Sequence, residues 1–209
     1  MYRTVAFPAN GRLRLKNFSG DVRIVGTNRR DVSVKARRRA ARPQLDHIKL
    51  DIQTSGSTVT IDANKRDEQW EREDHNNNVV ETTFEIEVPA SATLDVDAFS
   101  SDVIIENVEG EQQLKTFSGE ITVKGARRDV EAETFSADIR MDLGANARGT
   151  VRFSTLSGEL DAPISMPSGS CSRKKRMRWS GRRWMRGSTS SIRRMFTPRA
   201  GRSGSWARR

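Results

Sequence analysis

The chain has a single cysteine, Cys171, among its 209 residues, which excludes an intrachain disulfide and a cysteine-rich metal site. Its two histidines, His47 and His75, lie far apart in sequence with no cysteine near them, so no zinc site is predicted. No apolar run approaches the ~20 residues that a membrane span needs. The N-terminus also lacks the apolar core of a secretion signal. As written, the chain is expected to be soluble and without an export signal.

The sequence also lacks the motifs that mark common catalytic and nucleotide-binding sites. It contains no Walker loop, no dinucleotide-binding glycine cluster and no Gly-x-Ser-x-Gly nucleophile elbow. Cys171 has no histidine or carboxylate beside it that would activate a nucleophile. We therefore predict that the protein is not an enzyme and has no catalytic residues, no cofactor and no metal.

The formal net charge of +10 is concentrated at one end of the chain. Residues 166–209 contain 14 Lys or Arg and no Asp or Glu, together with three of the four tryptophans. We predict a β-strand-repeat domain over residues 1–165 and a basic, low-complexity, disordered tail over residues 166–209. A GC-rich gene read out of frame yields such a composition, so we interpret the tail as a frameshift product. The alternative is that the tail binds nucleic acid or an anionic surface, with no specific nucleic-acid site expected.

Apolar and polar residues alternate along most of the remaining chain, which predicts β-strands with one buried face. Phe84, Ile86 and Val88, for example, alternate with glutamates. Residues 65–78 are the best helical candidate, but we predict a polar loop there because only Trp70 could anchor a helix. The fold class predicted is therefore all-β.

A short motif of the form Phe-Ser-Gly-Asp recurs five times in this domain. The middle three copies begin 18 residues apart and the last follows after 21, which is typical of a solenoid whose coils stack on one another. The apolar parity switches at the motif, which indicates a corner of the backbone at each copy. The predicted corner residues are Phe18, Gly20, Phe99, Phe117, Gly119, Phe135, Leu156 and Gly158.

The motif phenylalanines are predicted to point inward, because Ile139 after the fourth copy shares the parity of Phe135. Phe99, Phe117 and Phe135 would then form an internal aromatic ladder with a spacing of about 4.8 Å. Leu156 would take the place of phenylalanine in the last coil. We favour core packing as the role of this ladder, and a ligand-binding aromatic strip is the alternative.

Surface carboxylates leave one enzymatic alternative open. Asp95 and Asp97, and likewise Glu131 and Glu133, are expected to share one wet face of neighbouring coils. Such rows could bind Ca²⁺ or supply the paired acids of a glycosidase. The alternative function is therefore a carbohydrate-active β-helix enzyme, and the interpretation we favour is a solvated face that keeps the sheet soluble.

Residues 12–22, Arg-Leu-Arg-Leu-Lys-Asn-Phe-Ser-Gly-Asp-Val, and the later motif copies resemble the bacterial "putative adhesin" family of β-strand-repeat proteins, a domain of unknown function. The resemblance covers roughly residues 4–165. It implies a parallel β-solenoid of ~18-residue two-strand coils, here preceded by an N-terminal β-meander, with a tie to the cell envelope and no established catalytic residues. The function expected is a non-catalytic scaffold for a protein or glycan partner. Without a closing coil after residue 161, the end of the solenoid would be exposed to self-association.

Overall fold

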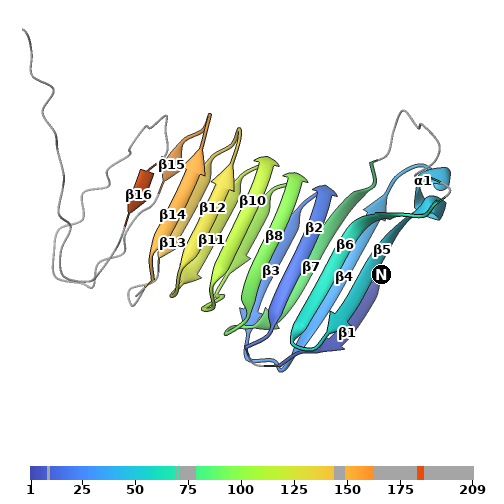
Figure 1. Cartoon of the computed structure of the whole chain (residues 1–209), viewed down its shortest axis with the longest axis horizontal. Coiled ribbons are helices and arrows are strands. Elements are labelled where there is room, and N and C mark those ends of the chain that lie inside the picture. The colour runs from blue at the N-terminus through green and yellow to red at the C-terminus, as the bar shows by residue number, and fades with distance from the viewer. Residues whose placement is uncertain (9, 69, 71–78, 144–148, 162–182, 186–209) are drawn as a thin grey trace, which may run out of the picture.

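The computed structural model describes residues 1–8, 10–68, 70, 79–143, 149–161 and 183–185, and most of these residues lie in β-strands. The strands form a stack of coils, and each coil of the repeat contributes one strand to either side (Figure 1). Neighbouring coils pair in parallel along both sides. The predicted fold class, an all-β parallel solenoid of two-strand coils, is confirmed.

In the described part of the chain, sixteen strands and the helix α1 have defined bounds. In chain order they are β1 (Tyr2–Ala6), β2 (Arg12–Ser19), β3 (Val22–Thr27), β4 (Asp31–Arg39), α1 (Arg42–His47), β5 (Ile48–Ser55), β6 (Thr58–Arg66), β7 (Glu81–Pro89), β8 (Thr93–Ser100), β9 (Val103–Glu106), β10 (Gln112–Ser118), β11 (Ile121–Ala126), β12 (Val130–Thr134), β13 (Ile139–Leu143), β14 (Val151–Thr155), β15 (Leu160–Asp161) and β16 (Arg183–Met185).

Backbone pairing sorts these strands into two rows, which are the two sides of the solenoid. The β8 face consists of β5, β6, β2, β8, β10, β12, β14 and β16 in that order. The β9 face consists of β1, β4, β7, β3, β9, β11, β13 and β15. The two rows are joined where Ser19 of β2 pairs with Glu81 of β7.

The register between coils equals the sequence repeat. Leu94 of β8 pairs with Gln112 of β10, which in turn pairs with Val130 of β12, so each step is one 18-residue repeat. The first motif copy joins the same stack, since Arg12 of β2 pairs with Thr93 of β8. Equivalent residues of successive coils therefore lie side by side across strands about 4.8 Å apart.

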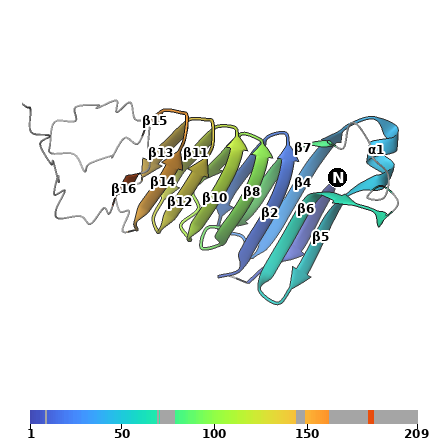
Figure 2. The same cartoon turned by 45° about the horizontal axis from the view of Figure 1, so that its top comes forward.

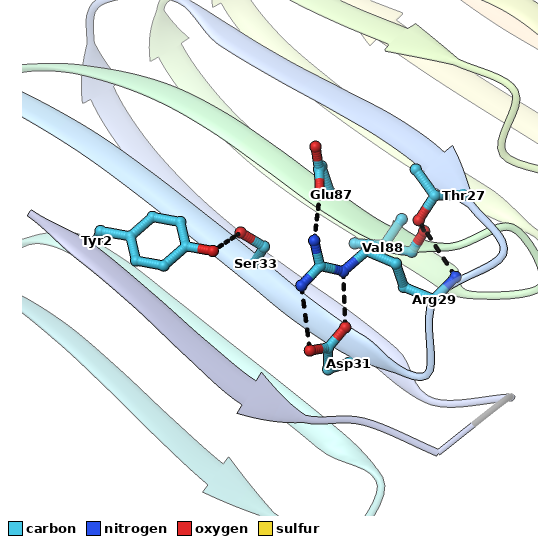
Figure 3. Close-up of polar contacts among 7 residues, drawn as sticks. All are labelled: Tyr2, Thr27, Arg29, Asp31, Ser33, Glu87 and Val88. Atoms are coloured by element: carbon cyan, nitrogen blue, oxygen red, sulfur yellow. Dashed lines mark hydrogen bonds and ion pairs between the residues drawn. The ribbon is translucent and has the colours of Figure 1, made fainter.

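The N-terminal part closes the stack with antiparallel strands, but among them only β5 and β6 are consecutive in the chain, so they do not form the predicted β-meander. β4 runs antiparallel to β7, β5 to β6, and β1 to β4. The turn between β3 and β4 is held by Arg29, which donates to Asp31 at 2.8 and 3.2 Å and to Glu87 at 2.8 Å (Figure 3). Hydrogen bonding to Arg29 lowers the pKa of Asp31. At the edge strand, Ser33 Oγ donates to the Tyr2 hydroxyl at 3.2 Å.

A short helix, α1, occupies the end of the stack beside β4 and β5 (Figure 2), and the alternation of apolar and polar residues did not predict it. Pro43 stands in its first turn, where a missing N–H costs nothing. The side chain of Gln44 accepts a hydrogen bond from the Ala41 N–H at 2.9 Å.

Residues 65–78, predicted as a polar loop, are described only in part, and the described ones correct that prediction. Lys65 and Arg66 belong to β6, and Glu68 and Trp70 are helical, because Asp67 accepts the Trp70 N–H at 2.9 Å as an N-cap residue does. There Trp70 is buried and stacks on His47 with ring centroids 4.9 Å apart.

The core lies between the two faces and consists of the inward residues of alternating strands. Leu13 and Leu15 of β2, Phe84 of β7 and Leu114 of β10 are among its fully buried side chains. In the first coil the inward corner position holds Asn17. Its amide donates to the Thr82 carbonyl at 3.1 Å and to Ser101 Oγ at 3.2 Å, and so links three coils.

The motif phenylalanines do not belong to this core, and the prediction that they point inward was wrong. Phe18, Phe99, Phe117 and Phe135 are 37–47% exposed, and Leu156 is 65% exposed. The parity switch itself is present, because Ala98 and Val103 are both buried although they are an odd number of residues apart. The switch falls after the phenylalanine, which therefore keeps the outward parity of the strand before it.

Most of the predicted tail, including Cys171, lies outside the described residues. Within it, β16 pairs antiparallel with β14, so these three residues do not fit the expectation of a tail without strands. The disorder and the frameshift origin of the tail stay predictions.

Candidate interaction surface

Four phenylalanines, one from each of four successive coils, lie one above another on the outside of the β8 face. Ring centroids are 4.7 Å apart between Phe18 and Phe99, 4.9 Å between Phe99 and Phe117, and 4.8 Å between Phe117 and Phe135. The corresponding ring planes lie within 14°, 3° and 6° of parallel. We call this row the phenylalanine ladder, and Leu156 occupies the equivalent place in the last coil.

The residue before each of the last three ladder phenylalanines is small or β-branched and points into the core. Ala98, Thr116 and Thr134 occupy the inward position at the end of β8, β10 and β12 and are buried. The Thr116 hydroxyl donates to the Phe99 carbonyl of the adjacent coil at 3.5 Å. With the inward position filled, the next side chain must point to solvent.

The acidic residue that ends the motif has a structural task at the corner. Asp102 Oδ1 accepts a hydrogen bond from the Glu120 N–H of the next coil at 2.8 Å, and Asp138 Oδ1 accepts one from Glu159 N–H at 2.7 Å. Each contact joins one corner to the equivalent corner of its neighbour. These two motif aspartates therefore help to hold the coils in register, whereas Glu120 accepts hydrogen bonds from Thr122 and Arg140.

The ladder presents ring edges to solvent, because the ring faces are occupied by stacking. Phe99 and Phe117 each have an aromatic neighbour on both faces. Among the described residues, the outer faces of the two end rings, Phe18 and Phe135, have no stacked ring. Phe18 is the least exposed of the four and Phe135 the most exposed, with Leu156 in the equivalent place of the next coil. Ligands that stack on an aromatic face, as sugar rings do, therefore find little free ring face here.

A row of alternating charge runs beside the ladder, two residues before it on each strand. Asp62 of β6, Lys16 of β2, Asp97 of β8, Lys115 of β10 and Glu133 of β12 are in register across the face. Their formal signs alternate from negative to positive and back. Lys115 and Glu133 form an ion pair at 3.3 Å. We call these five residues the charge row.

A second row, two residues further back, follows the charge row. Arg14 of β2 is in register with Asp95 of β8, which is followed by Gln113 of β10 and Glu131 of β12. Arg14 Nε donates to Asp95 Oδ2 at 2.9 Å. We call these four residues the second row, and both rows consist of side chains that are at least partly exposed.

The acid pairs predicted from sequence lie on one outer face, as expected, but not on neighbouring coils. Asp95 and Asp97 are on β8, Glu131 and Glu133 are on β12, and β10 lies between them. The structure therefore does not bring the two acid pairs into one cluster. No group of three or more potential metal-binding side chains occurs in the described part of the chain.

A shallow hollow of about 410 Å³ opens at one end of the ladder. Its walls combine ring edges with polar groups of the charge row and of Asn64, which stands two residues after Asp62 on β6. The hollow lies over β6, β2, β8 and β10. It is thus an extension of the strip that the ladder and the charge row define.

The β9 face has a different character, because its outward residues are mostly joined in ion pairs. Glu106 accepts from Arg23 at 2.7 Å and forms an ion pair with Lys124 at 3.3 Å. Hydrogen bonds from Arg23 and Lys124 lower the pKa of Glu106. Ile104 of β9 is 36% exposed and Tyr2 of the edge strand β1 is 66% exposed, and these are the exposed large hydrophobic side chains on the described strands of this face.

His47 belongs to a small cluster of side chains with a structural role. His47 Nδ1 lies 2.9 Å from Asp67 Oδ2, and Asp67 Oδ1 accepts the Trp70 N–H at 2.9 Å. The Trp70 hydrogen bond and the His47 contact lower the pKa of Asp67. This cluster fixes the segment after β6 against α1. His75 lies outside the described residues.

The fold and this strip together define a β-solenoid with an exposed aromatic surface. Residues 81–183, just under half of the chain, match the family model described as Toastrack DUF4097. The matched segment runs from β7 into β16 and passes the predicted domain boundary at residue 165. The resemblance to an adhesin-like domain of unknown function, inferred from the motif, is confirmed.

One solved structure that is similar to this chain is a putative cell adhesion protein from Clostridium sporogenes. The TM-score is 0.46 at 8% sequence identity, over 69% of this chain and 73% of that chain. None of the curated proteins matches this chain. Among the described residues, no helix has the length and apolar character of a membrane span.

Proposed function

We propose that this protein is a non-catalytic adhesion scaffold of the cell envelope that binds a protein partner through the phenylalanine ladder. The observation that carries the proposal is the ladder itself: four stacked phenylalanines, 37–47% exposed, in register across four coils. Exposed apolar surface of this extent, bordered by charged residues, is typical of a protein interaction site.

The geometry favours a protein over a glycan as the partner. Glycans bind aromatic side chains mainly by stacking on ring faces, and stacking within the ladder leaves mainly edges free. A protein surface can pack apolar side chains against ring edges and place charged groups along the alternating row. The charge row would then fix the register of the partner.

A non-catalytic role is supported by the regularity of the repeat on this face. Asp95 is paired with Arg14 at 2.9 Å and Glu133 with Lys115 at 3.3 Å, so these acids already have partners across the strands. The hollow on the strip is open, and its lining residues come from the repeat strands and from β6. The match to a family without an assigned activity, and the resemblance to adhesins, support a place at the cell surface.

The proposal predicts that adhesion depends on the ladder. A non-adherent bacterial strain that displays the full chain is tested under flow on two lawns, one displaying the same chain and one not. One of the two lawns is expected to retain cells that display the native chain. On that lawn, the double variant Phe99→Ser with Phe117→Ser is expected to reduce the number of retained cells at least about tenfold, since central apolar residues carry most of the energy of an interface.

Ile104→Ser is the matched control, because it removes an exposed apolar side chain from a central strand of the opposite face. Retention of cells displaying this control should equal that of the native chain, with thermal melts showing that both variants are folded. If the double variant is retained as strongly as the native chain, the ladder is not the adhesion surface.

A further inference from the structure

We propose that the partner of the ladder is a second copy of this chain, bound face to face and antiparallel, with a two-fold axis parallel to the strands between β8 and β10. This inference rests on the proposed function and names its partner. Isologous pairing of one surface with itself is the commonest way in which soluble proteins form closed assemblies.

The position of the axis follows from the ladder. Its four phenylalanines come from β2, β8, β10 and β12, so the midpoint of the ladder lies between β8 and β10. An axis along the strands at this midpoint keeps each row opposite the same row of the second copy. Phe99 then faces Phe117, and Phe18 faces Phe135, so that the whole ladder is covered.

At this same position the charge row becomes complementary to itself. Lys16 faces Glu133 of the second copy, and Asp97 faces its Lys115. The second row behaves in the same way, because Arg14 faces Glu131 of the second copy. Complementary charges across an interface fix its register and exclude competing arrangements.

Alternative two-fold arrangements lose this match. An axis parallel to the stack would place each strand opposite the same strand of the second copy and would reverse the order of the rows, so only one row could face itself. If that were the charge row, Asp97 would face Asp97, Lys115 would face Lys115, and the ladder would face the second row. An axis through β8 has the same fault at its centre, where the two copies of Asp97 would meet. The axis between β8 and β10 therefore combines full coverage of the ladder with opposite charges at every facing pair of ionised side chains from β2 to β12.

The ends of the strip also fit this arrangement. β6 and β14 flank the four ladder strands and therefore face each other across the axis. Leu156, the most exposed apolar residue next to the ladder, follows β14, and Asn64 of β6 lines one end of the hollow that lies over β6, β2, β8 and β10. A protruding leucine is thus brought opposite a hollow that includes the edge of Phe18.

Charge reversal tests the pairing with the full chain in analytical ultracentrifugation. At about 100 µM the native chain is expected to be a dimer, since this exceeds a micromolar dissociation constant by about a hundredfold. Lys16→Glu alone and Glu133→Lys alone are each expected to dimerise at least about tenfold more weakly, because like charges meet twice across the axis. An equimolar mixture of the two variants should dimerise again, because both facing pairs in the mixed dimer are opposite in sign.

Recovery in the mixture cannot arise from repaired folding, because neither protein changes when they are combined. Lys124→Glu, which changes an exposed lysine on the β9 face, should dimerise like the native chain. A native chain that is monomeric at about 100 µM, or a mixture no heavier than its separate components, would overturn the inference. If the chain is monomeric but adhesion still depends on the ladder, the proposed function stands and the partner is not a second copy. If the chain dimerises but adhesion does not depend on the ladder, the proposed function is wrong and the dimer stands.

Discussion

Phe84→Ala is expected to lower the free energy of unfolding by about 3–5 kcal/mol, because it empties a fully buried position between the two faces. Phe117→Ala removes a ring of the same size from the outside of the solenoid. Its loss comes mainly from stacking on Phe99 and Phe135, about 1–3 kcal/mol for the two contacts, and leaves no enclosed cavity. Urea unfolding of the two variants and the native chain measures both values.

The comparison separates the two possible orientations of the motif. If the phenylalanines pointed inward, Phe117→Ala would leave a cavity as large as that of Phe84→Ala, and the two variants would be equally destabilised. A third variant, Ile104→Ala, truncates an exposed apolar residue without any aromatic stack. It should cost less than Phe117→Ala, which isolates the contribution of the ladder.

Gly119→Ala is expected to destabilise the solenoid by about 2–4 kcal/mol, a large effect for a single methyl group. Gly119 has φ +154°, and a Cβ built on it would overlap the carbonyl oxygen of Ser101 in the adjacent coil. The overlap is with backbone, so no side-chain rotation can relieve it. The coils would have to separate at the corner, as a lower midpoint in thermal or urea unfolding would show.

Gly56→Ala is the control for the backbone conformation alone. Gly56 lies in the hairpin turn between β5 and β6 with φ +57°, and a Cβ there would meet nothing within 4 Å. The alanine should cost only about 1 kcal/mol, from the left-handed backbone. Equal destabilisation by the two alanines would show that the close approach of the coils contributes nothing.

The stacking of the coils could be predicted because it depends on spacing alone. Each coil must bury its apolar face against the next, so a repeat of 18 residues fixes the register that pairs Gln112 with Leu94 on one side and with Val130 on the other. The close approach behind Gly119 was not visible in the sequence, since it involves Ser101 of another coil. Because Ser101 and Ala137 replace glycine in two copies of the motif, the sequence did not indicate that glycine is required at position 119.

The orientation of the ladder could not be predicted from the parity switch, because the switch can fall on either side of the phenylalanine. Counted forward, Phe135 shares the parity of the buried Ile139; counted backward, Phe99 shares the parity of the outward Asp97. The backward count was the correct signal. The backward count is correct because Ala98 points inward and fills the core position that the phenylalanine ring was expected to take.

The interaction strip was predictable only as separate residues. The sequence singled out Asp95 and Asp97, but their relation to Lys16 arises because β2 packs against β8 across a gap of more than seventy residues in the chain. Helix α1 was missed because it is only six residues long and follows no apolar period. Long-range strand pairing, which local patterns do not encode, thus decided what the surface contains.

The most direct test of the account is whether the ladder is open to solvent in the folded protein. Phe117→Cys and Leu114→Cys, each combined with Cys171→Ser, place one thiol at an outward or an inward position of the same strand, β10. In dilute native buffer the Phe117→Cys thiol should react with a maleimide nearly as fast as in urea, and the Leu114→Cys thiol should be protected. Protection at position 117 together with reaction at position 114 would contradict the account.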